Sequence, residues 1–291
     1  MLPEPKISYK PFWGICRPLN SWRANSPNPI QIYCADLIEF FLFLWHLISM
    51  KILLANRVFL IHNMYSYIED YCNDYLYDGE GFNCSITIRM SDILYEKEKS
   101  RREDIKEGIS IREFSDAYLE TLAVYRKICR CLLDEDILLF HGSVVSVDGI
   151  GYLFTAKSGT GKSTHTRYWR EYFKDRAIMI NDDKPLLEIK DGHVNVYGTP
   201  WDGKHRLSTN ACVPLKAICI LNRGQNNRIR RIDGMDAYSI LIQQVNRPVG
   251  DALAMSKTLE LIDRLCSCVE FYSMHCTMDI DAARVAYEGM K

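Results

Sequence analysis

The sequence predicts an α/β fold with a mixed sheet, and three observations lead to that class. Short apolar runs alternate with longer segments whose apolar residues recur at helical spacing. Two Asp-Gly pairs, Asp148-Gly149 and Asp191-Gly192, each separate two apolar runs and predict antiparallel hairpins, because both turn residues need positive φ. A glycine-containing segment, residues 156–163, joins a strand-like run to a helix-like one.

The composition is that of a globular protein. The 291 residues are enough for one large domain, or for one domain with a smaller lobe, and 47% of them are hydrophobic and 25% charged. The formal net charge of -1 argues against a broad surface for nucleic acid, so we expect no such partner. None of the 11 cysteines sits in a CxxC pair. We therefore expect free thiols, no cysteine metal site and a reducing, cytoplasmic location.

The first 49 residues form an unusual extension. Residues 1–29 are rich in Pro, Asn and aromatics, and residues 37–50 are very apolar but contain Glu39 and His46. A membrane-spanning helix needs about 20 mainly apolar residues, so we expect a buried or interfacial helix and no membrane association. No small-residue cleavage site follows, which argues against a signal peptide. A strand pattern begins at Met50, and a second start there would make residues 1–49 dispensable. N-terminal sequencing of the native protein tests that hypothesis.

Residues 50–112 predict a small N-terminal α/β lobe. Residues 51–62 have the pattern of two short strands broken at Ala55-Asn56, residues 65–77 that of a helix, and residues 83–90 that of a strand. The charge run at residues 96–107 is typical of a solvated loop or helix face.

Residues 113–291 predict the larger domain. Ser115 can cap a helix in which Leu119, Leu122, Cys129 and Leu132 recur at helical spacing. The strand at residues 152–155 leads into the glycine segment and is expected to have an antiparallel partner. Most nucleotide-binding folds with such a segment have parallel neighbours there, so this arrangement reduces the number of possible folds. Further strands are expected at residues 137–140, 144–147, 177–180, 186–189, 193–197, 216–221 and 269–275. Helices are expected at residues 163–173, 235–245, 252–266 and 281–290.

The segment AKSGTGKS, residues 156–163, fits a phosphate-binding loop except that Ala156 replaces the first glycine. Gly159 and Gly161 would let consecutive N–H groups point at phosphate oxygens, which also face the positive start of the next helix. Lys162 would reach the β and γ phosphates, and Ser163 would ligate Mg²⁺. A flexible glycine turn would not explain the Lys-Ser pair. We therefore predict ATP and Mg²⁺ as cofactors, bound by Ala156, Lys157, Ser158, Gly159, Thr160, Gly161, Lys162, Ser163 and Thr164.

Two adjacent carboxylates, Asp182-Asp183, follow the apolar run at residues 177–180. Such a strand end lies beside the phosphate loop in this fold class. One carboxylate could hold Mg²⁺, while the other could accept a proton from an attacking hydroxyl. The alternative is a turn that caps Pro185. The hairpin could also bring His141 beside the loop, where it would act in the site or serve as a structural histidine.

The segments HGSVVSVDGIGYLFTAKSGTGKST and INDDKPLLEI resemble the catalytic domain of HPr kinase/phosphorylase, and most closely its smaller HPr-kinase-like bacterial relatives. That fold is related to the nucleotide domain of ATP-dependent phosphoenolpyruvate carboxykinase. The resemblance covers about residues 140–189 and implies a P-loop serine kinase that uses ATP and Mg²⁺. It implies that His141 is an active-site histidine, that Lys162 and Ser163 bind phosphate and magnesium, and that Asp183 accepts the proton.

The sequence also departs from that family. The family's magnesium-binding Glu has no counterpart, and Asp202, in YGTPWDGKHRLS, is our candidate for that metal-ligating role beside Asp182. Arg247, in NRPVGD, is our candidate for a catalytic arginine. The segment that docks HPr and reverses the reaction is not recognisable, so the resemblance does not extend to HPr or to phosphorylase activity. Residues 198–208 predict either a substrate-contacting loop or an ordinary solvated one.

These patterns favour an ATP- and Mg²⁺-dependent phosphotransferase acting on a Ser or Thr hydroxyl of a protein, peptide or small molecule that the sequence does not identify. The alternative is a nucleotide-binding regulatory or adaptor protein without transfer chemistry. A true carboxykinase is disfavoured, because the chain is too short for two such lobes. The resemblance also favours a homo-oligomer. Incubation with γ-labelled ATP and a cell lysate discriminates between the first two functions.

Overall fold

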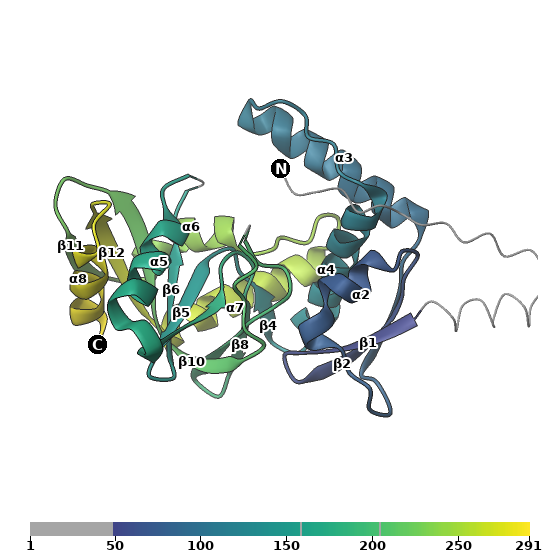
Figure 1. Cartoon of the computed structure of the whole chain (residues 1–291), viewed down its shortest axis with the longest axis horizontal. Helices are drawn as coiled ribbons and strands as arrows, with labels where there is room; N and C mark the ends of the chain where they lie inside the picture. The colour runs from purple at the N-terminus through teal and green to yellow at the C-terminus, as the bar shows by residue number, and fades with distance from the viewer. Residues whose placement is uncertain (1–48, 158, 204) are drawn as a thin grey trace, which may run out of the picture. The chain divides into compact units, whose positions relative to one another are not determined.

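Figure 1 shows a computed structural model of the chain, which describes residues 49–157, 159–203 and 205–291. Our expectations for residues 1–48, including the apolar helix, lie outside the described residues. The described residues belong to one compact unit. Among their helices, none has the length and apolarity needed to cross a bilayer.

A three-stranded sheet is formed by β1 (Ser49–Leu54), β2 (Arg57–His62) and β3 (Cys84–Thr87). β1 and β2 are antiparallel and turn at Ala55 and Asn56, whose φ angles are 51° and 59°, whereas β3 runs parallel to β2. Burial alternates along β1, as expected for a sheet with one face on a core.

The helices that accompany this sheet differ from the sequence prediction. The helix expected at residues 65–77 is only α2 (Tyr67–Tyr71), followed by a 3₁₀ turn, η1 (Asn73–Tyr75). The charge run falls within α3 (Met90–Glu107), but that face is not wholly solvated. Glu96 and Asp104 are buried because they form ion pairs with Arg126 and Arg112.

Helix α4 (Asp116–Leu133) packs on both sheets of the fold. The Ser115 side chain accepts the Tyr118 N–H at 3.3 Å and so caps the helix as expected. Its apolar stripe is fully buried and joins the core under β1 and β2. Members of that stripe include Leu119, Ala123, Val124, Ile128 and Leu132.

The second sheet is mixed and contains the glycine segment. In the described part of the chain its order is β4-β8-β9-β10-β6-β5-β7, with β12 pairing both β10 and β11. β10 is antiparallel to β9 at its start and parallel to β6 and β12 further on. Its strands are β4 (Ile137–Leu139), β5 (Ser143–Val147), β6 (Ile150–Thr155), β7 (Ala177–Asn181), β8 (Leu186–Lys190), β9 (His193–Tyr197), β10 (Cys212–Arg223), β11 (Arg228–Ile232) and β12 (Glu270–Cys276).

Two tight turns build the hairpins of this sheet. Asp148-Gly149 joins β5 to β6 with φ angles of 51° and 81°, and Asp191-Gly192 joins β8 to β9 with φ angles of 52° and 76°. Both residues of each pair adopt left-handed backbone angles, as two-residue hairpin loops require. β6 therefore has an antiparallel neighbour, β5, and a parallel one, β10.

Helices cover both faces of this sheet (Figure 1). Val145, on β5, packs in the core under α5 (Lys162–Phe173) and α8 (Asp281–Met290). Its neighbour Val144 points the other way, into the core under α6 (Gly234–Gln244) and α7 (Ala252–Cys268). A 3₁₀ turn, η2 (Lys174–Arg176), connects α5 to β7. β11 was not predicted, because its sequence RIRRI lacks apolar alternation.

Candidate functional site

β6, β7 and β10 end on the same side of the second sheet, and we call this row of carboxyl ends the edge that carries the site. β5 is antiparallel to both β6 and β7, and its first residues pair with Phe154 and Asn181. β6 and β7 therefore end side by side. β10 runs parallel to β6, with Ile220 opposite Thr155, so it ends at the same edge. This topology brings together segments that are far apart in the sequence.

The glycine segment follows β6 at this edge. Gly159 and Gly161 have φ angles of 74° and 114°, a region that side-chain-bearing residues rarely adopt. The Thr160 N–H donates to the Lys157 carbonyl at 3.2 Å, and α5 begins directly after Gly161. No side chain caps α5 in the described part of the chain, so no side chain competes for its first N–H groups. Ser158 lies outside the described residues.

Lys162 starts α5 and lies within the field of the acidic pair. Its Nζ is 3.5 Å from the Ala156 carbonyl oxygen. Burial lowers the pKa of its ammonium group, while the negative charges of Asp183 and Asp182 act in the opposite direction. Lysine and both carboxylates therefore share one electrostatic environment.

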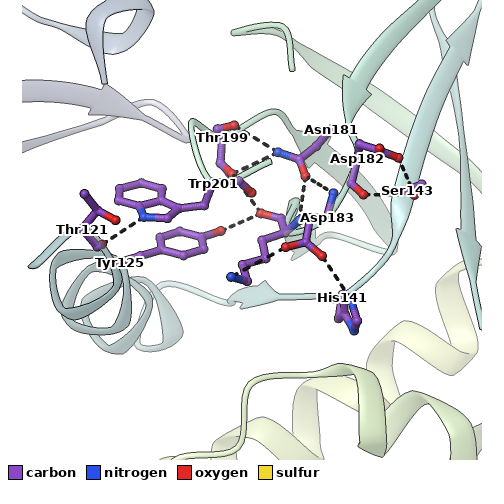
Figure 2. Close-up of polar contacts among 10 residues, drawn as sticks. Thr121, Tyr125, His141, Ser143, Asn181, Asp182, Asp183, Thr199 and Trp201 are labelled. Atoms are coloured by element: carbon purple, nitrogen blue, oxygen red, sulfur yellow. Dashed lines mark hydrogen bonds and ion pairs between the residues drawn. The ribbon is translucent and has the colours of Figure 1, made fainter. Parts of the chain in front are cut away.

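Asn181 organises the turn that carries the two aspartates (Figure 2). Its side-chain oxygen accepts the N–H groups of Asp183, at 2.9 Å, and Lys184, at 2.7 Å. Its side-chain nitrogen donates to the Thr199 carbonyl and hydroxyl oxygens, both at 3.0 Å. Because Asn181 is fully buried, these bonds fix the turn without competition from water.

Asp182 points into the protein and is held by a serine. Only 6% of the residue is exposed, and its Oδ1 accepts the Ser143 hydroxyl at 2.8 Å. Its other oxygen faces Gly203, where a Cβ would lie 2.9 Å from Oδ2. Glycine at position 203 therefore leaves space beside this carboxylate.

Asp183 has a different environment, because it pairs with a histidine. Its Oδ1 is 3.0 Å from His141 Nε2, and its Oδ2 is 3.6 Å from Lys184 Nζ. Burial alone would raise the pKa of Asp183, but the hydrogen bond from His141 and the charges of Lys184, His141 and Lys162 hold it below its usual value. The carboxylate is thus ionised at neutral pH and can accept a proton.

The backbone around His141 is fixed from two sides. Its N–H donates to the Gln244 carbonyl at 2.7 Å, and its carbonyl accepts the Thr155 hydroxyl at 3.2 Å. The next N–H, of Gly142, donates to the Asp183 carbonyl at 3.0 Å. The His141 side chain remains 43% exposed, so the histidine–aspartate pair is accessible from solvent.

Tyr125, on α4, and Trp201 form an aromatic pair that supports the same turn. The Lys184 carbonyl accepts the Tyr125 hydroxyl at 2.7 Å and the Thr199 hydroxyl at 2.9 Å. The Tyr125 ring stacks on Trp201, with ring centroids 4.1 Å apart and planes 3° from parallel. The Trp201 indole N–H donates to the Thr121 carbonyl at 2.9 Å. Figure 2 shows this path from the helix to the acidic turn.

The segment at residues 198–208, predicted to be a substrate-contacting or a solvated loop, is partly buried among its described residues. Trp201 is 1% exposed and supports the turn through its stacking on Tyr125. Asp202 has a side chain that is 1% exposed, accepts the Ser208 N–H at 2.9 Å and lies 3.5 Å from Arg206 Nε. Burial raises the pKa of Asp202. Its charge acts on Tyr71 and Tyr75, which places it toward the N-terminal lobe. Lys204 lies outside the described residues.

Arg247 lies in the stretch that follows α6. Val245 pairs with Phe140, and the Asn246 N–H donates to the Leu139 carbonyl at 3.1 Å, so this stretch runs beside the segment leading to His141. Arg247 lines a cavity of about 370 Å³ bounded by α3, α4 and β4. Within the described chain, the structure does not bring the Arg247 side chain into contact with Asp183 or His141.

Several supporting residues could not be named from the sequence. Arg223, at the end of β10, donates from Nη2 to the Gly159 carbonyl at 2.6 Å. Only the parallel pairing of β10 with β6 reveals that this arginine reaches the glycine loop. Asn181 did carry a local signal, since an Asn side chain often accepts backbone N–H groups just ahead of it. Tyr125 and Thr199 carried none.

Comparisons with known proteins add little to this description of the site. No family model matches the chain, and no curated protein matches it. A solved structure described as the Hpr(Ser) kinase/phosphatase from Coxiella burnetii is 14% identical, with a TM-score of 0.24. That match covers 44% of this chain and 96% of the other.

Proposed function

We propose that the protein is an ATP- and Mg²⁺-dependent phosphotransferase that moves the γ-phosphoryl group to a Ser or Thr hydroxyl of a protein, peptide or small molecule. One observation carries the proposal. An ionised carboxylate, Asp183, is hydrogen-bonded by His141 and shares its surroundings with Lys162 at the start of α5. A glycine loop alone would support nucleotide binding only, whereas the adjacent base supports transfer.

The nucleotide phosphates would bind to the glycine loop and the start of α5. The N–H groups of residues 159–164 and the positive helix end favour an anion there. The Lys162 ammonium would lie against the β and γ phosphates and offset the charge that develops during transfer. The contact of Arg223 with the Gly159 carbonyl would hold the loop beside these groups.

The donor set fits a magnesium ion that is bound partly by phosphate. Among the described residues, no cluster of three His, Cys, Asp or Glu side chains could enclose a metal. Mg²⁺ often takes only one or two protein oxygens and fills its shell with phosphate and water. Asp182 and the Ser163 hydroxyl would supply those oxygens, and the space at Gly203 leaves the Asp182 carboxylate room for a ligand. Bound there, the ion would neutralise phosphate charge. We leave Asp202 out, because its Oδ2 accepts the Ser208 N–H and its Oδ1, although it has no hydrogen-bond partner, lies 3.5 Å from the Arg206 guanidinium, which offsets its charge.

Asp183 would act as the base. Its carboxylate would take the proton of the acceptor hydroxyl as that oxygen bonds to the γ phosphorus and the bond to the β-phosphate oxygen breaks, leaving ADP. His141 would orient Asp183 and keep it ionised. Arg247 is a candidate for contacting the acceptor, since the stretch that carries it lies beside the segment leading to His141.

The test is transfer of label from γ-labelled ATP to acceptors in a cell lysate, with wild-type protein and Asp183→Asn. Asparagine can still hydrogen-bond with His141 but cannot accept a proton. We expect labelled product from wild type and loss of about 10²–10⁴-fold in Asp183→Asn, with ATP binding retained. Asp191→Asn, in an exposed turn, is the matched control. Normal transfer by Asp183→Asn would refute the base, and ATP binding without any transfer by wild type would favour the adaptor alternative.

A further inference from the structure

We propose that Cys84 and Cys131 form an oxidisable pair that closes a disulfide between the N-terminal sheet and helix α4. Their Sγ atoms are 2.6 Å apart, although the residues are 47 positions apart in the chain. Both cysteines are free, and a disulfide bond is about 2.0 Å long. Formation of the bond therefore needs only a small further approach. This proposal is independent of the phosphotransferase function.

A second contact shows that β3 and α4 lie side by side next to the two cysteines. Lys127, one helical turn before Cys131, donates from Nζ to the carbonyl of Thr87 at 2.8 Å. Thr87 and Cys84 are the two ends of β3, and β3 is the edge strand of its sheet. Residues four apart lie on the same helix face, so Lys127 and Cys131 both face this edge. The approach of the two sulfurs is thus set by the packing of α4 on β3.

The two cysteines are assigned different roles in the reaction. Both are half-buried, but burial and then the neighbouring Cys84 raise the pKa of Cys131 to about 12. A thiol with so high a pKa provides little thiolate at neutral pH, and thiolate is the attacking form. We therefore assign Cys131 as the resolving partner, and Cys84, which starts the edge strand β3, as the residue that reacts first with an external oxidant.

The oxidant is a low-molecular-weight disulfide such as glutathione disulfide. The Cys84 thiolate attacks one of its sulfurs, releases one glutathione thiolate and forms a mixed disulfide. Cys131 then attacks Cys84 Sγ as its proton leaves, and the second glutathione thiolate departs. Two cysteine thiols are oxidised, one glutathione disulfide is reduced, and the two released thiolates take up the two protons.

The bond would fasten the N-terminal sheet to the helix that supports the acidic turn. Tyr125 and Thr121, on the same helix, hold Lys184 and Trp201. Cross-linking positions 47 residues apart removes conformational freedom from the unfolded chain. We expect the oxidised protein to melt about 5–10 °C above the reduced protein.

The test uses the full chain equilibrated with mixtures of reduced and oxidised glutathione, alkylated with N-ethylmaleimide and mapped by mass spectrometry. The expected result is one cross-linked peptide pair joining Cys84 to Cys131, together with the rise in Tm, both reversed by dithiothreitol. Cys84→Ser should abolish both effects. Cys268→Ala, which removes a half-buried cysteine on α7, should keep both.

Peptide mapping of the wild type decides the question even if a variant folds poorly. Recovery of Cys84 and Cys131 as separate alkylated residues in fully oxidising buffer would overturn the proposal. A cross-link from either residue to a different cysteine would overturn it as well.

Discussion

The glycine loop and the acidic turn lie at the same sheet edge but are held in different ways. The loop takes its shape from glycine backbone angles, and few side chains contact it: Lys162 at 3.5 Å from the Ala156 carbonyl and Arg223 at 2.6 Å from the Gly159 carbonyl. The turn at residues 181–184 is held by buried side chains, with Asn181, Thr199 and Tyr125 all hydrogen-bonded to its backbone.

This difference shows how binding and chemistry can be divided between two segments. A loop whose shape depends on glycine backbone angles can adapt to a charged ligand, which then completes its order. A base must be fixed before the reaction, because fixed dipoles and charges need no rearrangement in the transition state. The loop is therefore expected to govern nucleotide affinity, and the turn to govern transfer.

The largest expected effect on nucleotide affinity tests the loop half of this comparison. Lys162→Ala removes the cation that faces both carboxylates and the proposed phosphates. We expect nucleotide affinity to fall at least about 100-fold, because hydrogen bonds and charge pairs to phosphate are among the strongest in proteins. Calorimetric titration with ATP and Mg²⁺ measures the change. Lys190→Ala, a surface substitution on β8, should leave affinity unchanged, and equal affinity in both variants would contradict the assignment of Lys162.

The next effect tests the turn. Asn181→Ala removes a buried side chain that makes four hydrogen bonds and leaves the N–H groups of Asp183 and Lys184 without that partner. We expect the free energy of unfolding to fall by about 3 kcal/mol. Transfer should fall more than nucleotide affinity does.

Urea denaturation and the transfer assay measure these two effects. Asn226→Ala, an exposed substitution beyond β10, is the control and should change neither. If Asn181→Ala lowered nucleotide affinity as much as transfer, the proposed division between loop and turn would be wrong.

Local signals in the sequence led to most of this fold. Asp148-Gly149 and Asp191-Gly192 depend only on their own backbone angles, and Ser115 only on the helix it caps, so each could be read in isolation. β11 and the buried face of α3 could not be read, because both are stabilised by distant partners. Glu96, for instance, is buried where Arg126 of another helix forms an ion pair with it.

The same distinction between local signals and distant partners applies to the residues of the site. The fold class, together with the order of loop and acidic pair along the chain, predicted that Asp182 and Asp183 lie beside the phosphate loop that carries Lys162. The loop at residues 198–208 was expected to contact either a substrate or solvent, and Asp202 was a candidate metal ligand, but the side chains of Trp201 and Asp202 are both buried. Whether an aromatic or acidic residue in a glycine-rich loop points inward depends on the surface it meets, here α4 and the N-terminal lobe. That surface is set by tertiary packing, which the local pattern does not contain.

A smaller effect concerns α5, the helix that follows the glycine loop. His165 is buried in α5, accepts the Trp169 indole N–H at 3.0 Å, and burial lowers its pKa to about 4. An unfolded histidine titrates near 6.5, so the unfolded chain binds more protons between these values. The stability from neutral His165 is therefore complete above about pH 6.5 and is lost as the pH falls to 4. We expect this loss to be on the order of 3 kcal/mol.

Comparing wild type with His165→Gln by denaturant unfolding at pH 7 and pH 4 isolates this contribution. The variant should lose less stability than wild type over that interval, because it lacks the titrating group. His193→Gln, exposed on β9, should behave like wild type. An equal loss of stability in wild type and His165→Gln would contradict a buried neutral histidine beneath the loop.

The smallest effect concerns Arg223, the one described side chain from a neighbouring strand that donates to the glycine loop. The residue is exposed, and a hydrogen bond of this kind contributes about 1 kcal/mol or less. Arg223→Ala should therefore weaken nucleotide binding only about three- to fivefold, without changing the stability of the fold. Arg228→Ala removes the same charge from exposed β11 and controls for long-range electrostatics. If the two variants weakened ATP binding equally, the effect would come from net charge and not from the contact with Gly159. A loss confined to Arg223→Ala would show that the end of β10 helps to shape the loop, and so sharpen the contrast with the side-chain-held turn.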